Sequence, residues 1–389
     1  MFCFIINNLN WNWRIIMRKI KVGLVGYGVI GSGVVELLQN NREEIEKRTG
    51  IDIELAYVVD KDWKTPRRVE VKDAIKTDNY KLVIEDKTID VVIELVGGTD
   101  FAYKLIEEAL NNNKNIVTAN KALLAEKGKK LFELAKEKNL LLYFEASVCG
   151  GIPIIRTITD ALASDKIYCI NGIVNGTTNY ILTKMYEEQI SFTKALKEAQ
   201  KLGFAESDPT LDINGNDAAH KITILASLAF NTEIDFNKVY FEGIDKIQLE
   251  DIKDADELGY VIKLLAIAKK DPDNTIEVRV NPTLVKKDNQ LAFIRNEYNA
   301  VLLESEYLTD SLYVGKGAGS RPTSTAVVSD LIDIGLSLDN KIKRIKYNVY
   351  NNYEIKHIGS ITSRYYLRFN VLDKPGVLYK ISGVFSKNN

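Results

Sequence analysis

The chain has 389 residues, of which 46% are hydrophobic, and its 52 Lys and Arg residues nearly balance its 53 Asp and Glu residues, leaving a formal charge of -1. This length predicts two or three domains, and the near-neutral charge argues against nucleic acid or an anionic membrane surface as a partner, which leaves a small molecule. The three widely separated cysteines, Cys3, Cys149 and Cys169, favour a reducing, cytoplasmic compartment over a disulfide scaffold.

The N-terminal segment before Met17 begins with a short apolar run that asparagines soon interrupt. A signal peptide needs a basic start and a longer apolar stretch, and a membrane span needs about 20 apolar residues. Neither pattern is present in this segment. Since Arg18-Lys19 and the first clear strand follow directly, we expect either a disordered tail or a start codon placed too early.

The next part of the chain alternates apolar strands with helical patterns. An apolar strand from Ile20 leads into a glycine turn and a helix, and further apolar runs at 53–59, 91–96 and 115–118 alternate with helical patterns such as 101–110 and 128–138. Strands that alternate with helices imply parallel crossovers. Residues 18–152 therefore predict a doubly wound α/β domain of the Rossmann type.

The glycine turn, Gly26-Tyr27-Gly28-Val29-Ile30-Gly31, fits G-x-G-x-x-G. Its three glycines permit a tight turn, a close approach of the backbone to pyrophosphate, and close packing of helix on strand. The helix that follows presents free N–H groups to phosphate. The pattern alone is weak, because glycines also occur in ordinary turns, but its place between a strand and a helix favours dinucleotide binding by Gly26, Gly28, Val29, Ile30 and Gly31.

The tip of the second strand is where the adenosine ribose is read. An acidic residue there favours NAD, and a basic residue favours the 2′-phosphate of NADP. Asp60 and Lys61 point to opposite answers, so we expect both cofactors to be used. A mild preference for NADP follows if Lys61, Lys64, Arg67 or Arg68 folds over the phosphate.

After Pro153 the pattern changes to mixed α+β. We expect a helix at 154–163, a strand at 168–174, a block of helices to about Phe230, and strands at 277–280 and 300–303, separated by turns at Asn281-Pro282 and at 287–289. These elements predict a substrate and dimerisation domain over residues 153–315. A glycine-rich stretch then opens a helix at 323–334, which we expect to complete the first domain within residues 316–342.

The last piece, residues 345–389, contains YYLRFNVLDKPGVLYKISGVF, which alternates like a strand, turns at 373–376 and continues as an amphipathic helix. It resembles the opening strand and helix of an ACT domain, a small ligand-sensing βαββαβ module. Such a module needs more residues than this piece provides, so we expect a partial ACT-like domain.

The segment GFAESDPTLDINGNDAAHK, residues 203–221, carries a concentrated set of charges. We expect Pro209 and Asn214-Gly215 to keep its first half out of helix, and Asn216 or Asp217 to cap the helix that follows. On that helix Asp217 and Lys221 share a face with the apolar positions 224, 225 and 228. An Asp–Lys pair four residues apart is common on solvated helices. A pair in phase with apolar residues is instead typical of active sites.

This segment resembles the signature of the homoserine dehydrogenase family, as do VTANKALLA (117–125), EASVCGGIPII (145–155) and VNGTTNYIL (174–182). With the glycine turn, these motifs cover the chain from about residue 20 to 335. The resemblance implies reversible reduction of L-aspartate 4-semialdehyde to L-homoserine with NADP or NAD, in the biosynthesis of threonine, methionine and isoleucine, by a homodimer or homotetramer.

The resemblance also implies roles for individual residues. It makes Lys221 the proton donor, and hydride transfer to an aldehyde does create an alkoxide that an ammonium stabilises and protonates. It makes Glu206 and Asp217 substrate ligands, and a carboxylate suits the ammonium group of the substrate. The remaining implied residues are Asp212 as a supporting acid, Lys121 beside substrate and nicotinamide, and Lys61, Thr99 and Gly319 as cofactor contacts.

Glu145, Val148, Gly150 and Ile152 match the family's monovalent-cation (Na+) site, which is built mainly from backbone carbonyls. Grouped side-chain ligands would mark a transition-metal site, and none are grouped here. A packed turn between domains explains these residues equally well. Cys149 lacks a histidine partner, so we expect it to be a small core residue.

Two other functions stay open on the residues alone. Another amino- or hydroxy-acid dehydrogenase would use Lys221 in the same way, and substrate screening separates it from the first reading. A non-catalytic Rossmann and ACT sensor is the third possibility. The set Glu206, Asp217 and Lys221 argues against a sensor, which needs no proton donor.

Overall fold

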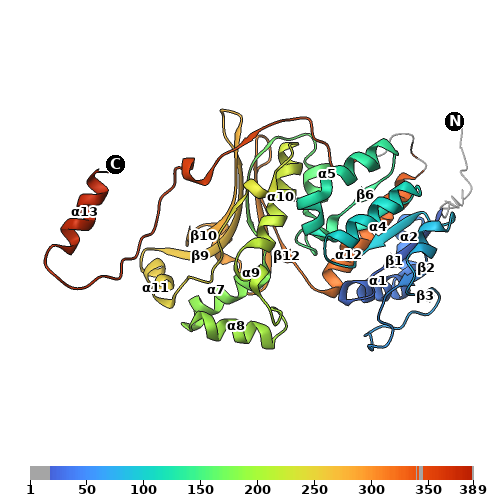
Figure 1. Cartoon of the computed structure of the whole chain (residues 1–389), viewed down its shortest axis with the longest axis horizontal. Coiled ribbons are helices and arrows are strands. Elements are labelled where there is room, and N and C mark those ends of the chain that lie inside the picture. Colours follow the sequence, from blue (N-terminus) through green and yellow to red (C-terminus); the bar gives the residue numbers. More distant parts are fainter. Residues whose placement is uncertain (1–17, 339, 341–344, 388–389) are drawn as a thin grey trace, which may run out of the picture.

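The computed structural model describes residues 18–338, 340 and 345–387. The expectations for the segment before Met17, and for positions 339, 341 and 342 of the helical completion, fall outside these residues. Two sheets organise the described residues, and Figure 1 shows them in separate halves of the molecule, with helix α10 between.

The first sheet is parallel, with strand order β3-β2-β1-β4-β5-β6. Its strands are β1 (Arg18–Val25), β2 (Ile51–Val59), β3 (Ile75–Thr77), β4 (Val91–Glu94), β5 (Asn115–Thr118) and β6 (Leu142–Tyr143). This is the doubly wound order of dinucleotide-binding sheets, whose ligands bind beyond the carboxyl ends of the strands at the switch point between β1 and β4. The predicted fold of this half is confirmed.

Helices cover both faces of the first sheet. The helices are α1 (Val29–Asn40), α2 (Arg42–Thr49), α3 (Lys81–Glu85), α4 (Asp100–Asn111), α5 (Lys121–Glu137) and α12 (Ser320–Ser337). On one face, Ile20 and Leu24 of β1 pack in a single core with Val34 of α1 and with Leu331 and Ile334 of α12. Helix α12 therefore returns to the first sheet from the far end of the chain.

The second sheet is mixed, with order β12-β11-β7-β9-β10-β13 and β8 paired to β10. Its strands are β7 (Ile167–Ile173), β8 (Tyr240–Phe241), β9 (Tyr260–Lys270), β10 (Thr275–Lys286), β11 (Tyr298–Ser305), β12 (Thr309–Lys316) and β13 (Glu354–Ile355). The accompanying helices are α6 (Ile154–Arg156), a π-helical turn (Thr157–Ala161), α7 (Gly176–Glu188), α8 (Phe192–Lys201), α9 (Thr210–Ile213), α10 (Asn216–Phe230) and α11 (Leu249–Glu257). Short 3-10 turns lie at Glu145–Ser147, Phe236–Lys238, Gln290–Phe293 and Ile358–Ser360.

The expected turn at Asn281-Pro282 is wrong, because both residues lie inside β10. On one side β10 pairs with β9 along its full length, and Pro282 stands opposite Leu264. On its other side β8 pairs only with Arg279 and Val280, so no strand needs the N–H that proline lacks. A proline is tolerated in this strand because it sits where the second side is unpaired.

Strand β9 was not expected from the sequence. It is a nearly continuous apolar run between Gly259 and Asp271, and short runs of this kind fit a buried strand or a buried helix equally well. Its alternate residues face two cores, with Leu264 and Ala266 packed toward α7 and α10, and Leu265 and Ile267 on the opposite face.

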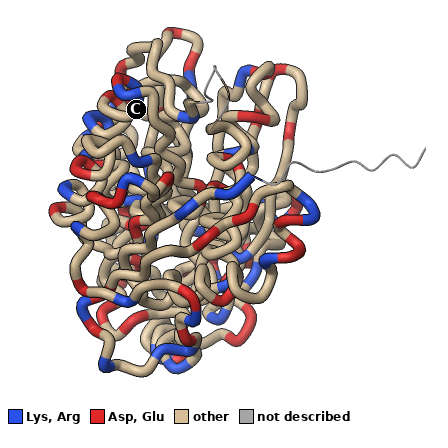
Figure 2. The backbone as a smooth tube through the Cα atoms, turned by 90° about the vertical axis from the view of Figure 1, so that its right-hand side faces the viewer, with Lys and Arg blue, Asp and Glu red and all other residues tan. Residues whose placement is uncertain are grey.

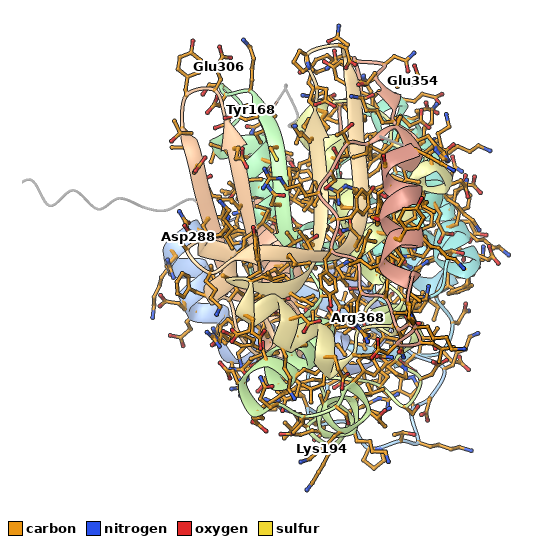
Figure 3. All side chains as sticks on the ribbon, turned by 90° about the vertical axis from the view of Figure 1, so that its left-hand side faces the viewer. Tyr168, Lys194, Asp288, Glu306, Glu354 and Arg368 are labelled. Atoms are coloured by element: carbon orange, nitrogen blue, oxygen red, sulfur yellow. The ribbon has the colours of Figure 1, made fainter. Side chains whose placement is uncertain are left out.

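The C-terminal segment first crosses both halves of the molecule and then leaves them. Strand β13 pairs with β10. Beyond it, Tyr366 and Arg368 bond to Asp251 of α11, and Figure 3 labels Arg368. Helix α13 (Val377–Lys387) forms as expected and stands apart from the rest of the structure (Figure 1). The expected strand within 365–372 is wrong, because no described strand lies beside it to accept its backbone hydrogen bonds.

In Figure 2 the positions of Lys and Arg are interspersed with those of Asp and Glu along the backbone, without a large region of one sign. This distribution agrees with the near-neutral formal charge. Across residues 18–338, 340 and 345–387, none of the helices has the length and apolar character needed to cross a bilayer.

Candidate active site

Helix α10 carries the predicted acid–base pair, and it is buried on nearly every side. Asp217 and Lys221 are only 7% and 8% exposed, as their phase with the apolar residues predicts. The expected cap is wrong, since the helix is preceded by Gly215 at φ 88° and Asn214 Oδ1 accepts the Asn216 N–H. Asp217 therefore has both oxygens available for other partners. The segment before it is also not free of helix, since the single turn α9 fits between Pro209 and Asn214.

Lys221 is held by two acceptors at the centre of the site. Its Nζ donates to Asp217 Oδ2 at 2.7 Å and to the Val174 carbonyl oxygen at 2.7 Å. Burial alone would lower the lysine pKa, but the Asp217 carboxylate outweighs it and raises the pKa above the ordinary value. Lys221 is thus an ammonium at neutral pH. Of its three N–H groups, one remains for an oxygen atom of a substrate.

Asp217 also receives a lysine from the first half of the molecule. Lys121 begins α5 at the carboxyl end of β5, and its Nζ lies 3.1 Å from Asp217 Oδ1. Burial would raise the Asp217 pKa, but the Lys221 and Lys121 ammonium groups hold it well below its usual range. The structure therefore brings the predicted Lys121, Asp217 and Lys221 together around one ionised carboxylate.

Asp212 joins this group through Asn175, which sequence reasoning did not single out. The Asn175 Nδ2 donates to Asp212 Oδ1 at 2.7 Å and to Asp217 Oδ2 at 2.8 Å. Burial and then the Asp217 charge raise the Asp212 pKa. The available signal was an asparagine between an expected strand and an expected helix, which is a typical helix-capping position.

Glu206 is not brought into this group. It lies exposed in the loop between α8 and α9, where only its backbone oxygen is bonded, to Gln200 Nε2. Its carboxylate has no ion pair with the described part of the chain. The described structure therefore gives this carboxylate no part in holding the fold together.

The glycine turn has the close contacts that its pattern predicts. A Cβ at Gly26 would lie 2.4 Å from the Leu95 oxygen, and one at Gly31 would lie 2.1 Å from the Gly26 oxygen. A Cβ at Gly28 would meet nothing within 4 Å, so open space lies over this glycine at the start of α1. Val29 beside it is 71% exposed. The turn thus fits a pyrophosphate group lying over Gly28 and the first N–H groups of α1.

A buried glutamate links the loops beyond β4 and β5. Glu94 Oε1 accepts the Val96 N–H, and Oε2 accepts the Thr118 hydroxyl at 2.5 Å. The Asn120 side chain then donates to the Gly98 carbonyl at 2.7 Å. These bonds hold the Gly97–Thr99 loop beside the start of α5, where Lys121 lies. Thr99 itself precedes α4 and is within 3.4 Å of Lys127 Nζ.

The tip of β2 is occupied by its own hydrogen bonds. Asp60 accepts the backbone N–H groups of Tyr27 at 2.6 Å and Asp62 at 2.8 Å. Arg67 Nη2 lies 3.8 Å from Asp60 Oδ1, and its buried Nε lacks a partner among the described residues. Lys61 instead extends over the Phe101 ring. Arg67 is therefore the cation that approaches the tip of β2.

Gly319 lies close to the glycine turn, although 288 residues separate it from Gly31. It precedes α12 with φ 110°, and the next residue, Ser320, donates to the Val29 carbonyl at 2.9 Å. The start of α12 therefore adjoins the start of α1. This position agrees with a contact to a cofactor bound at the glycine turn.

The Glu145 carboxylate is bonded to protein groups. Its oxygens accept the N–H groups of Ile155 and Arg156 at 2.9 and 2.8 Å. Burial, then the Asp330 carboxylate, raises its pKa to about 7. A cation at this turn would therefore rest on the backbone oxygens of Glu145, Val148, Gly150 and Ile152. No cluster of three His, Cys, Asp or Glu side chains suited to a metal occurs in the described part of the chain.

Cys149 is 1% exposed, which fits the expected core residue, although its φ of 52° places it in the left-handed region. Burial raises the pKa of its thiol, and the Asn299 amide lies 3.5 Å from the sulfur. The thiol is therefore neutral and shielded, which argues against a nucleophile.

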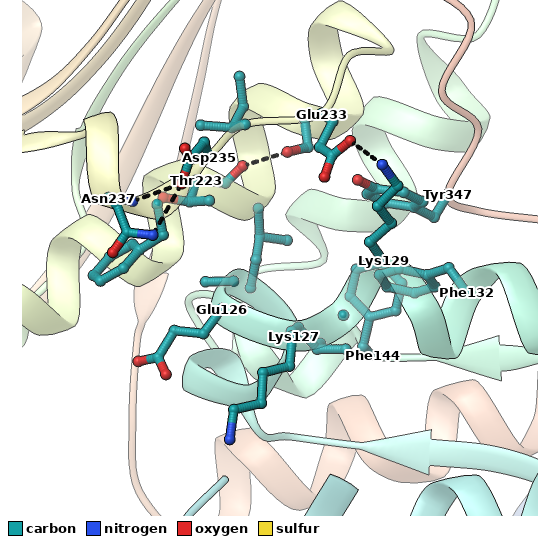
Figure 4. A pocket seen from close by; sticks show the side chains of 17 residues that line it. Glu126, Lys127, Lys129, Phe132, Phe144, Thr223, Glu233, Asp235, Asn237 and Tyr347 are labelled. Atoms are coloured by element: carbon teal, nitrogen blue, oxygen red, sulfur yellow. Dashed lines mark hydrogen bonds and ion pairs between the residues drawn. The ribbon is translucent and has the colours of Figure 1, made fainter.

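A cavity of about 580 Å³ lies beside the site, between α5 and α10 (Figure 4). Its charged lining groups already have protein partners: Lys129 pairs with Glu233 at 2.7 Å, and Glu126 lies 3.0 Å from His220 Nε2. Tyr347 closes one side and stacks on Phe132. The cavity is not lined by the glycine turn, whereas a dinucleotide is expected at the carboxyl ends of β1 and β4.

Comparisons with known proteins agree over most of the chain. Residues 26–145 match the family described as "Homoserine dehydrogenase, NAD binding domain", and residues 153–332 match "Homoserine dehydrogenase". The homoserine dehydrogenase of Neisseria gonorrhoeae is 42% identical over 379 residues, covering 96% of this chain and 87% of that protein. The crystal structure of a homoserine dehydrogenase from Thiobacillus denitrificans superposes with a TM-score of 0.85 at 37% identity, covering 95% and 87% of the two chains. A hyperthermophilic archaeal homoserine dehydrogenase in complex with NADPH gives a TM-score of 0.67 at 25% identity, covering 82% and 98%.

Proposed function

The chain belongs to the homoserine dehydrogenase family, and we propose that it catalyses the reversible reduction of L-aspartate 4-semialdehyde to L-homoserine in threonine, methionine and isoleucine biosynthesis. It is an NAD(P)-dependent oxidoreductase. One observation carries the choice of reaction: a buried ammonium, Lys221, is fixed by Asp217 and Val174 and keeps one N–H for a substrate oxygen.

The reaction follows from these groups. The nicotinamide cofactor, when bound, supplies or accepts the hydride. As charge develops on the aldehyde oxygen, the Lys221 ammonium donates to that oxygen and then transfers a proton to it. In the reverse direction a neutral Lys221 removes the hydroxyl proton of homoserine. Asp217 keeps the lysine oriented and compensates its charge inside the buried site.

We propose that Glu206 binds the ammonium group of the substrate, with Asp217, Asp212 and Lys121 completing the substrate site. The Glu206 carboxylate is exposed and unpaired in the described structure, and its loop joins α8 to α9. Closure of that loop would place the carboxylate over the site. The charge-assisted bond it would make is stronger than a neutral one.

For the cofactor we propose use of both NADP and NAD, with a mild preference for NADP. Gly26, Gly28, Val29, Ile30 and Gly31 would hold the pyrophosphate, and Thr99, Lys121 and Gly319 would line the crevice. At the ribose the supporting observation is that Asp60 is occupied by backbone N–H groups while Arg67 approaches it. Lys61 lies over Phe101, which weakens its own assignment to the phosphate.

We propose that residues 18–152 with 316–342 form the cofactor domain, that 153–315 form the substrate domain, and that 345–389 are a partial ACT-like domain. The packing of α12 on the first sheet supports the first division. The third piece contacts both of the others, since Tyr347 stacks on Phe132 of α5 and β13 pairs with β10, which supports treating it as a separate piece.

We propose a homodimer or homotetramer, formed through the second sheet. Tyr298 and Val314 are 41% and 49% exposed and flank the buried Ala300 on the face away from α7 and α10.

A further proposal is that a monovalent cation such as Na+ binds the backbone oxygens of the Glu145–Ile152 turn. Replacing Na+ by choline in the assay tests the cation proposal, and light scattering tests the oligomeric state.

We assign the enzyme to the cytoplasm because the described cysteines, Cys149 and Cys169, are buried and unpaired.

The proposed activity is tested by mixing the purified protein with L-homoserine and either NADP or NAD at neutral and alkaline pH. Reduced cofactor should accumulate, seen as its near-ultraviolet absorbance, faster at alkaline pH. Screening other amino and hydroxy acids under the same conditions tests the alternative dehydrogenases. The absence of a signal from homoserine with both cofactors at both pH values would remove the proposal.

A further inference from the structure

One side-chain amide connects the two aspartates of the site. We propose that Asn175 is a positioning residue for this reaction: by donating to Asp212 and Asp217 at once, it adds to Lys121 and Lys221 in keeping Asp217 ionised and in place as the partner of Lys221. This inference rests on the proposed function, because it concerns how the proton donor of that reaction is held.

The orientation of the Asn175 amide is fixed by four contacts. Its Nδ2 donates at 2.7 Å to Asp212 Oδ1 and at 2.8 Å to Asp217 Oδ2. Its Oδ1 accepts the Thr178 N–H at 2.8 Å and the Thr178 hydroxyl at 3.0 Å. A flipped amide would set its oxygen against two carboxylates and its N–H₂ against an N–H. The donors therefore face the acids, and Asn175 is 4% exposed, so water does not replace them.

Asn175 lies next to the two groups that hold Lys221, which are the Asp217 carboxylate and the Val174 carbonyl oxygen. Val174 follows β7 directly and offers its carbonyl oxygen to Lys221, and Asn175 is the next residue. The dipeptide Val174-Asn175 thus bonds Lys221 through the Val174 carbonyl oxygen and Asp217 through the Asn175 side chain. A change in the position of Asn175 would move both contacts.

The electrostatic reason for an amide at this position is the presence of two acids around it. Both aspartates accept from one nitrogen atom, so each feels the charge of the other, and the Asp212 pKa is raised by burial and by Asp217. Like charges so close share a proton unless donors or cations separate them. The groups that face the two acids are Lys121 on α5, Lys221 and His220 on α10, Thr177 on α7 and the Cys149 thiol.

Without the amide, a proton shared by Asp212 and Asp217 becomes favourable. Asp217 would then carry less negative charge at neutral pH, and Lys221 would lose part of the attraction that keeps it protonated and oriented. Removing the amide donor should lower kcat and shift the acid limb of the pH profile to higher pH. The affinity for the cofactor should stay unchanged, because the contacts of Asn175 lie on the substrate side.

A purely structural role must be separated from this one, since Asn175 also caps α7 through the Thr178 N–H. Asn175→Ser keeps a capping oxygen and removes both N–H donors, and its one O–H on a shorter side chain cannot bridge the two acids. Asn175→Asp keeps the shape and the cap and places a third acid between the two. The matched control is Ser191→Ala, which removes the side-chain cap of the neighbouring helix α8 and contacts none of the acids.

We expect Asn175→Ser to lose roughly 10- to 100-fold in kcat, the worth of a hydrogen bond to a charged group, with an unchanged KM for the cofactor. Asn175→Asp should lose more, with a larger shift of the acid limb. Ser191→Ala should lower only the melting temperature. Asn175→Ser with a wild-type kcat and pH profile and only a lower melting temperature would overturn the proposal. If the serine variant does not fold, the isosteric Asn175→Asp decides by the same criteria.

A second measurement does not depend on the reaction. Carbon-13 NMR titration of the aspartate carboxyl groups in the wild-type protein and in Asn175→Ser reports whether Asp217 stays ionised. We expect one carboxyl group to take up a proton at higher pH in the variant, and identical titrations would overturn the proposal. A wild-type enzyme inactive on homoserine, with the titration shift present, would refute the proposed function and leave the role of Asn175 supported.

Discussion

The Lys121 ammonium lies 3.1 Å from Asp217, and these two residues belong to different halves of the molecule. Lys121 begins α5 of the first sheet, whereas Asp217 lies in the first turn of α10 beside the second sheet. The contact therefore joins the expected cofactor crevice to the proton donor. It also explains how a carboxylate that is only 7% exposed stays ionised, since it has a lysine on each oxygen.

Replacing Lys121 by methionine should lower kcat/KM roughly 10- to 100-fold, because Asp217 loses one of its two cations and the substrate loses a neighbouring charge. Steady-state kinetics with homoserine measures the loss. Lys130→Met, which changes an exposed lysine on the same helix, is the control and should behave as wild type. Equal rates for Lys121→Met and wild type would show that the contact does not serve the reaction.

Replacing Lys221 by alanine should abolish turnover, with a loss of about 100- to 10,000-fold, because the alkoxide loses its proton source. Cofactor binding should survive, since Lys221 lies on α10 and not in the glycine turn. Fluorescence of reduced cofactor on titration into the variant measures the second effect. Near-normal turnover in this variant would refute the assignment of Lys221.

Oxidation of homoserine should accelerate as the pH rises into the alkaline range. The reverse reaction needs neutral Lys221, and Asp217 raises the lysine pKa above its ordinary value, so the neutral fraction is small at pH 7 and grows about tenfold for each pH unit. Reduction of the aldehyde uses the ammonium and should be favoured on the neutral side. Initial rates of homoserine oxidation and of aldehyde reduction, measured across the alkaline range, test whether pH affects the two directions in opposite ways. Rates that change with pH in the same way in both directions would contradict this prediction.

The sequence predicted the first half of the fold and the acid–base pair because both depend on local patterns. Alternating strands and helices define a parallel sheet, and the helical period alone places Asp217 and Lys221 on one face. The role of Asn175 and the position of Pro282 in a strand depend on tertiary contacts instead. Asn175 bonds to Asp217, which lies 42 positions further along the sequence. Pro282 is tolerated in β10 because β8 pairs only with Arg279 and Val280 on that side of the strand. Neither relation leaves a periodic signal.

The cofactor preference should depend on Arg67. Asp60 is bonded to backbone N–H groups, and Arg67 is the cation nearest to it, at 3.8 Å. Arg67→Ala should therefore lower kcat/KM with NADP about tenfold and change the value with NAD little, because only NADP carries the 2′-phosphate. Lys72→Ala, at an exposed position in the same connection between β2 and β3, is the control. Equal losses with the two cofactors would argue that Arg67 supports the fold and does not read the ribose.

Lys263 should make the stability of the protein depend on pH. Its Nζ donates to Asn179 Oδ1 at 2.9 Å and to the Ile294 carbonyl, and burial, with Arg295 adding to it, lowers its pKa to about 7. In the unfolded chain a lysine stays protonated to about pH 10.4. Between these values the unfolded state binds a proton that the folded state lacks, so stability from this group rises with pH by at most about 1.4 kcal/mol per unit.

The measurement compares urea unfolding of the wild type and Lys263→Met at several pH values from 6 to 10, since contributions from other groups cancel in the difference. The methionine variant loses two hydrogen bonds but carries no buried charge. Its free energy of unfolding relative to that of the wild type should therefore be most favourable at or below pH 7. Its relative stability should then fall steadily as the pH rises toward 10, because folded wild type no longer holds a buried ammonium. A difference that stays constant across this range would show that Lys263 remains protonated in the fold, which would require a negative partner that its described surroundings do not supply.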